Sequence, residues 1–138
     1  MTSQVIDSTA SVREPGAMTG PVANTQHRAA SYAVGLLHDV HPGPGMVEYL
    51  TEIDATLADH GGRFLIHGGE STVVEGTIDS DLIVIEFPDA DGATQWYHSD
   101  AYQQLARLRR TFAEGAVVLF GGAEAGHRAL DILHGWRG

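Results

Sequence analysis

Four short stretches of the chain are rich in apolar residues at consecutive positions. They run from Ser31 to Val40, from Arg63 to His67, from Leu82 to Pro88 and from Ala116 to Phe120. Their lengths, and the glycine, proline and polar residues around them, are typical of β-strands. The first, third and fourth are apolar on both faces, whereas a sheet with one face in water requires alternation. Both faces of the predicted sheet therefore need a cover.

The second stretch carries an ionisable ring within the apolar pattern. RFLIHGGESTVVEG, Arg63 to Gly76, predicts a strand, a break at two glycines and then a second strand. His67 stands just before the break, where an apolar residue would serve a plain core better. A double glycine permits a β-bulge, and bulges often re-aim a side chain beside an active site. His67 is therefore the first candidate for function.

Apolar residues at helical spacing predict two helical regions between the strands. One helix begins near Pro44 and ends at Gly61; a short helix follows Asp89, and another begins at Asp100. Their apolar stripes consist of Met46, Tyr49, Leu50, Ile53 and Leu57 in the first and of Tyr102, Leu105, Arg109 and Phe112 in the last. A further stripe predicts a short C-terminal helix that docks on its own core or on a partner subunit; it comprises Ala125, Ala129, Ile132, Leu133 and Trp136.

The order strand–helix–strand–strand–helix–strand, with a split second helical region, predicts an α+β fold. It favours a ferredoxin-like antiparallel sheet with helices on one face. Since the helices cover only one apolar face, we expect a homodimer packed sheet against sheet. The domain spans residues 31–122. Residues 1–30 show no periodicity and are expected to form a disordered tail, and residues 123–138 form a helical extension.

Composition excludes several kinds of chemistry. The 138 residues include 8 basic and 18 acidic ones, a net charge of −10, and no basic stripe for nucleic acid. All the basic residues are arginine and there is no cysteine, which excludes lysine Schiff bases, thiolate nucleophiles and zinc–thiolate sites. No nucleotide-binding glycine motif indicates a cofactor, so none is expected. No apolar run suggests a signal peptide or a membrane partner, and we expect a cytoplasmic protein.

Several strings together resemble a known family. HGGRF, GGESTVVEG, IVIEFPD, WYHSDAYQQLARLRR and VVLFGG, within roughly Tyr32 to Gly122, are similar to the bacterial "domain of unknown function 1330" family of the dimeric α+β barrel superfamily. The resemblance implies a ferredoxin-like protomer and a dimer whose two sheets enclose a cavity. The superfamily includes cofactor-free monooxygenases, isomerases, cyclases and lyases of small organic molecules, and also binding proteins. The chain departs from the pattern at His67, where family members often carry arginine, and at HDVHPGPG, where they usually begin a helix with aspartate.

Histidines and one carboxylate are the main candidates for proton transfer. His67 can act as a general acid or base because an imidazole titrates near neutrality. Strand parity places Arg63, Leu65 and His67 on one face, opposite Phe64 and Ile66. The structural alternative for His67 is a buried ring hydrogen-bonded to a backbone carbonyl. His38 would assist it, and His41, which completes an H-x-x-H pair, is a candidate for substrate binding.

Charged and aromatic residues complete the candidate site. Glu86 is the lone charge in its strand; it either orients a histidine or the substrate, or forms a structural ion pair with Arg63 or Arg109. Either arginine would otherwise hold a carboxylate or enolate oxygen. Trp96 and Tyr102 line an aromatic pocket or belong to the core.

These features favour a cofactor-free enzyme that isomerises, cyclises or cleaves a small, partly apolar organic molecule, as a step of a biosynthetic pathway. Its catalytic residues would be His67, His38 and Glu86. The alternative is a non-catalytic protein that binds a small ligand in the same cavity. A third hypothesis is a metal-dependent enzyme in which His38, His67 and Glu86 bind the metal ion.

Overall fold

The computed structural model describes residues 29–135, and residues 30–122 form one compact unit. The elements follow the predicted order, with the second helical region split in two. None of the helices in residues 29–135 is long and apolar enough to cross a membrane. The elements are β2 (Ser31–His38), α2 (Pro44–Ala58), β3 (Arg63–His67), β4 (Asp81–Phe87), α3 (Gly92–Tyr97), α4 (Asp100–Phe112), β5 (Glu114–Gly121) and the 3₁₀ helix η1 (Ala129–Gly135).

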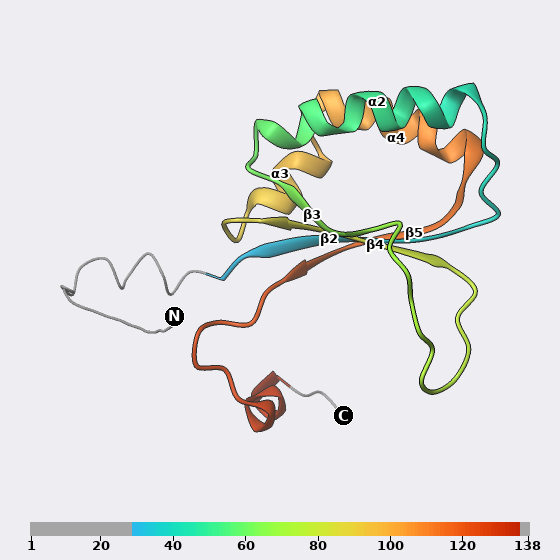
Figure 1. Cartoon of the computed structure of the whole chain (residues 1–138). Coiled ribbons are helices and arrows are strands. Elements are labelled where there is room, and N and C mark those ends of the chain that lie inside the picture. Colours follow the sequence, from blue (N-terminus) through green and yellow to red (C-terminus); the bar gives the residue numbers. More distant parts are fainter. Residues whose placement is uncertain (1–28, 136–138) are drawn as a thin grey trace. The chain divides into compact units, whose positions relative to one another are not determined.

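The four strands form one antiparallel sheet in the order β3–β4–β2–β5. Helices α2 and α4 lie side by side across one face of this sheet, and α3 joins β4 to α4 (Figure 1). The arrangement confirms the predicted ferredoxin-like α+β fold with its helices on one face.

The core lies between that face of the sheet and the helices. Alternate residues of β2 and β4 point into it, which is why the strands present Ala33, Leu37, Ile85 and Phe87 to the helices. Trp96, Tyr102 and Phe87 are the largest fully buried side chains. The indole nitrogen of Trp96 donates a hydrogen bond to the hydroxyl of Thr56 on α2 at 3.0 Å, so its polar group is satisfied within the core.

The opposite face of the sheet is apolar and open. Leu36, Leu82, Val118 and Phe120 alternate with the core residues of their strands and keep between 37% and 52% of their surface exposed. The sequence therefore indicated correctly that these strands are apolar on two faces while the helices cover only one.

A β-bulge in β3 changes the predicted direction of His67. Arg63 pairs with Glu86 and Phe64 with Ile85, but the register then shifts, and Ile66 and His67 pair with Val84 and Ile83. Leu65 is the additional residue. Because one extra residue reverses the alternation, His67 lies on the same face as Phe64, and the predicted grouping of His67 with Arg63 is wrong.

The second strand predicted after the double glycine is also absent. Residues 68–80 form a long loop that leaves the sheet on the side away from the helices (Figure 1). Gly68 adopts a positive φ of 75° where the chain turns out of β3. Val73, Val74 and Ile78 in this loop are exposed. Their β-propensity has no effect here because β3 is an edge strand and no neighbouring strand pairs with the loop.

Beyond the compact unit, the C-terminal segment, for which a short helix is predicted, forms the 3₁₀ helix η1. The carboxylate of Asp131 accepts a hydrogen bond from the backbone N–H of Arg128 at 2.9 Å. None of the residues of η1 is buried. Trp136 and residues 1–28 of the expected tail lie outside the described residues, and the docking of this helix stays a prediction.

Gly115, at the start of β5, provides a test of the sheet geometry. Its φ is +137°, and a Cβ there would collide with the carbonyl oxygen of Leu36 on the neighbouring strand. We expect Gly115→Ala to lower the free energy of unfolding by about 1–3 kcal/mol from the backbone conformation alone. The melting temperature should fall by about 4–8 °C for each kcal/mol lost.

The matched control is Gly121→Ala, at the other end of the same strand. No atom lies within 4 Å of the Cβ that this change would add. We expect a melting temperature close to that of the unchanged protein. Equal effects of the two substitutions would contradict the close approach of β5 to β2 at Gly115.

Candidate functional site

A cavity of about 510 Å³ lies between the inner face of the sheet and helices α2 and α4. Its size falls within the range of small-molecule sites. Tyr49, Tyr102, Arg109 and Phe112 line it from the helices, and residues 67–71 line it where β3 runs into its loop. The structure thus contains a cavity on the helix side of the sheet. The cavity expected between two sheets requires a second chain and stays a prediction.

The helix side of the cavity is aromatic. The Tyr102 ring lies 4.0 Å from that of Trp96 and 6.2 Å from that of Tyr49, measured between ring centroids, and Tyr49 also packs edge-on against Phe112. Trp96 and Tyr102 are both buried and line the cavity, so the two alternatives for them, pocket and core, are not exclusive. These rings offer flat apolar surfaces on which an organic molecule can stack.

Two tyrosine hydroxyls place a polar group within this aromatic wall. The hydroxyls of Tyr49 and Tyr102 lie 2.7 Å apart and share one hydrogen bond. Burial, followed by the neighbouring Tyr102 hydroxyl, raises the pKa of Tyr49 well above its ordinary value, so the phenol stays neutral. One hydroxyl donates to the other, and the accepting hydroxyl keeps its own proton for a further acceptor. Sequence reasoning counted Tyr49 only as a core residue, because a phenol at an apolar helix position gives no sign of its partner.

Arg109 contributes a buried positive charge to the same cavity. The residue is 7% exposed, and its Nε has no hydrogen-bond partner. Among the residues that the structure describes, neither a hydrogen bond nor an ion pair involves its guanidinium. The predicted alternative in which Arg109 pairs with Glu86 is not formed.

Glu86 instead pairs with Arg63 on the open face of the sheet. Its Oε1 accepts hydrogen bonds from Arg63 Nε at 3.0 Å and Nη2 at 2.9 Å, and its Oε2 accepts one from the Tyr32 hydroxyl at 3.1 Å. The hydrogen bond to Glu86 raises the pKa of Tyr32. The three side chains are cross-strand neighbours, so this ion pair has the structural form that the sequence offered as an alternative. Glu86 and Arg63 therefore lie outside the helix-side cavity.

His67 lies at the edge of the cavity. Its ring stacks on that of Phe64 with a centroid distance of 4.4 Å and an interplanar angle of 19°. The residue lines the cavity and is also exposed to solvent. The bulge turns His67 toward the helix side of the sheet, at the end of the strand beside the loop, and its role in function stays a prediction. The alternative of a buried ring is not observed in the single chain.

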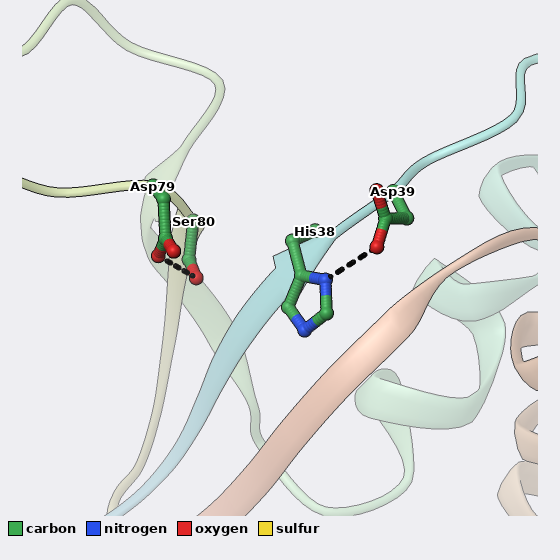
Figure 2. A network of polar contacts seen from close by, with 4 residues as sticks. All are labelled: His38, Asp39, Asp79 and Ser80. Carbon is green, nitrogen blue, oxygen red and sulfur yellow. Dashed lines mark hydrogen bonds and ion pairs between the residues drawn. The ribbon is translucent and has the colours of Figure 1, made fainter.

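His38 is the last residue of β2 and His41 lies in the loop that follows it, and neither is among the residues that line the cavity. His38 Nδ1 is 2.9 Å from Asp39 Oδ2, and Figure 2 shows the two side chains turned toward each other. The side chain of His41 is exposed. Glu86 lies opposite Tyr32, which is six residues from His38 along β2. At the rise of a β-strand, six residues separate Glu86 from His38 by about 20 Å.

The metal site of His38, His67 and Glu86 is therefore not assembled. Within residues 29–135, the one group of three possible ligands within 4.8 Å of one another is His38, Asp39 and Glu114. These residues are at least partly exposed, and the hydrogen bond between His38 and Asp39 explains their proximity without an ion.

The environment of His38 predicts a measurable titration. The hydrogen bond that His38 donates to the Asp39 carboxylate, with smaller contributions from the charges of Asp39, Glu114 and Asp79, raises the pKa of His38 above its ordinary value of 6.5. Since the folded-state pKa is raised, the stabilisation is present below pH 6.5 and is lost as the pH rises through the folded-state pKa. NMR titration of the imidazole should show this elevated pKa, and Asp39→Asn should lower it.

Asp54→Asn on α2 is the matched control, because Asp54 is not among the charges that act on His38. An unchanged His38 titration in Asp39→Asn would contradict the observed hydrogen bond.

Comparison with known proteins agrees with this architecture. RPA0582, a protein of unknown function from Rhodopseudomonas palustris, has a TM-score of 0.52 at 14% identity, over 78% of this chain and 95% of its own. Its methylated form has a TM-score of 0.52 at 14% identity, over 80% of this chain and 96% of its own. SnoaB, a cofactor-independent oxygenase from Streptomyces nogalater, has a TM-score of 0.48 at 13% identity, over 72% of this chain and 99% of its own. No curated protein matches the sequence.

The likeness to RPA0582 shows that the two chains share one fold. The family model described as a domain of unknown function, DUF1330, matches residues 30–123, which span the whole sheet and its helices. The chain therefore belongs to the DUF1330 family.

Proposed function

We propose that this protein is a cofactor-independent enzyme that transfers protons on a small, partly apolar organic molecule bound in the helix-side cavity. The observation that carries the proposal is the composition of that cavity. Within about 510 Å³ it combines aromatic walls, a neutral tyrosine pair with an unused hydroxyl proton, and a histidine at its edge. A cavity with a few convergent polar groups and a titratable residue is the usual form of a small-molecule active site.

His67 is assigned the role of general base and acid. The stack on Phe64 holds the imidazole at the cavity edge, and exposure allows it to exchange protons with water. The imidazole removes a proton from a carbon next to a carbonyl group, and the electron pair of the broken C–H bond forms an enolate. The imidazolium then returns the proton to another atom of the substrate, which is an isomerisation, or to a leaving group, which is an elimination.

The tyrosine pair is assigned the stabilisation of the enolate oxygen. A neutral phenol in a low-dielectric site donates a hydrogen bond that strengthens as negative charge develops on the acceptor. His38 and Glu86 do not line the cavity, so proton transfer is assigned to His67 alone.

A non-catalytic binding protein is the second candidate. The exposure of His67 favours it, because a catalytic base is usually better shielded from water than this ring is. In that case the tyrosine pair serves only to orient a bound ligand.

Deuterium exchange tests the enzymatic role without knowledge of the natural substrate. A panel of small aromatic ketones and keto acids is incubated with the protein in D₂O, and loss of the proton next to the carbonyl group is followed by NMR. We expect catalysed exchange for at least one compound. His67→Ala should keep most of the melting temperature and lose roughly 10²–10⁴-fold in exchange rate.

His41→Ala is the matched control, since His41 is exposed and does not line the cavity. Full exchange activity in His67→Ala would contradict the assigned role. Saturable binding without catalysed exchange of any compound would favour the binding protein.

The open apolar face of the sheet supports a homodimer in solution. We expect light scattering to give about twice the chain mass of 14.7 kDa. A stable interface of this kind commonly buries about 2,000 Å² or more in total. Val118→Glu places a charge on the open face and should shift the measured mass toward that of the monomer. Val47→Glu is the control, because Val47 is an exposed residue of α2, and it should leave the mass unchanged. A monomer mass for the unsubstituted protein at micromolar concentration would refute the dimer.

A further inference from the structure

The buried guanidinium of Arg109 indicates which class of molecule enters the cavity. Arginine stays protonated in proteins, so this residue keeps a positive charge inside an apolar wall. An ionic group taken out of water without a partner costs several kcal/mol. Among the described residues no carboxylate neutralises Arg109, and its Nε lacks even a neutral acceptor. A bound anion would supply the partner that Nε lacks among the described residues.

The burial of Arg109 follows from its position on α4 and is not shared by the other arginines of that helix. Tyr102, Leu105, Arg109 and Phe112 form the buried stripe of α4, whereas Arg107 and Arg110 are exposed. A leucine or methionine at position 109 would continue the stripe at no electrostatic cost. The charge is therefore placed in the cavity at the expense of stability, as is common at functional sites.

The geometry points to a small monocarboxylic acid with a flat, apolar body as the natural ligand of this cavity. This inference rests on the proposed function and names the substrate class of the same site. The unpaired Nε and the neighbouring terminal nitrogen of a guanidinium form one edge that matches the two oxygens of a carboxylate. The aromatic rings of Tyr49, Trp96 and Tyr102 supply the surface for the body of the molecule.

Two further features fit a carboxylate. The charge of Arg109 acts on Tyr49 and lowers its pKa against the larger effect of burial, so the two groups are close enough to interact. The unused hydroxyl proton of the tyrosine pair can then reach the same end of the ligand. Glu70 and Asp81 also line the cavity and are exposed, so their charges oppose a ligand that carries more negative charge than Arg109 can neutralise.

A matched series of naphthalene probes tests the inference. 2-Naphthoate, 2-naphthamide and 2-naphthyl phosphate share one body and differ in charge, and their binding to the full chain is measured by calorimetry. We expect naphthoate to bind at least about tenfold more tightly than the amide, which is the effect of about 1.4 kcal/mol. Naphthyl phosphate should bind more weakly than naphthoate.

Variants of α4 assign the preference to Arg109. Arg109→Met should abolish the preference for naphthoate over naphthamide, and Arg109→Lys, which keeps the charge without the planar fork, should retain only part of it. Arg107→Met and Arg110→Met on the exposed face of the helix are the matched controls and should retain it fully. Without ligand, Arg109→Met should melt at the same or a higher temperature, because it removes a buried charge.

Several results would overturn the inference. These are equal binding of naphthoate and naphthamide, tighter binding of naphthyl phosphate, no saturable binding of naphthoate at millimolar concentration, or a retained preference in Arg109→Met. A large loss of melting temperature in Arg109→Met would instead show that the arginine serves folding. Naphthoate binding without deuterium exchange would leave the carboxylate site intact and refute only the enzyme, whereas exchange of neutral ketones that is unaffected by Arg109→Met would refute only the carboxylate site.

Discussion

The packing of α2 and α4 onto one face of the sheet is the interaction on which both the fold and the cavity depend. Large side chains of the helices, above all Tyr49, Tyr102 and Phe112, meet small residues at the centre of β2. Ala33 and Gly35 lie there, and both line the cavity. Because the central strand presents so little volume, the aromatic side chains cannot close the space completely at ordinary packing density. The cavity is thus a consequence of which residues the strand alternation turns inward.

The same alternation turns every second residue of each strand to the opposite face, where aliphatic residues surround one cluster of polar side chains. Tyr32, Arg63 and Glu86 satisfy one another there. A carboxylate on an apolar face needs such partners if the face is to become buried. This arrangement uses Arg63 and Glu86 for the sheet surface and leaves Arg109 without a carboxylate among the described residues. The division of the two arginines between the two faces therefore places one buried positive charge in the wall of the cavity.

The sequence predicted the fold well because hydrophobic periodicity is a local property. The stripe on α4 and the apolar runs of β2, β4 and β5 were each sufficient to predict their elements. The register of β3 could not be predicted in this way, since the extra residue Leu65 is defined only by its pairing with β4. The loop after Gly68 resembled a strand because Val73 and Val74 favour extended backbone, but a strand also needs a neighbour.

The candidate site was predicted less completely, because much of it also depends on contacts between elements. His67 was found by its unusual residue type. The tyrosine pair and the isolation of Arg109, in contrast, depend on contacts between α2, α4 and the sheet.

The distribution of charge within the site has a consequence for its chemistry. In the proposed site, a carboxylate held by Arg109 would fix one end of a flat molecule among the tyrosines, and the length of that molecule would then determine which of its atoms reaches His67 at the cavity edge. Proton transfer requires the donor and acceptor atoms to approach within hydrogen-bonding distance. The distance between the buried cation and the exposed imidazole would therefore select substrates by length, and the aromatic walls would select them by thickness. Specificity of this kind requires no contact with the reacting carbon itself, which suits a site whose one imidazole among the described residues lies at its edge.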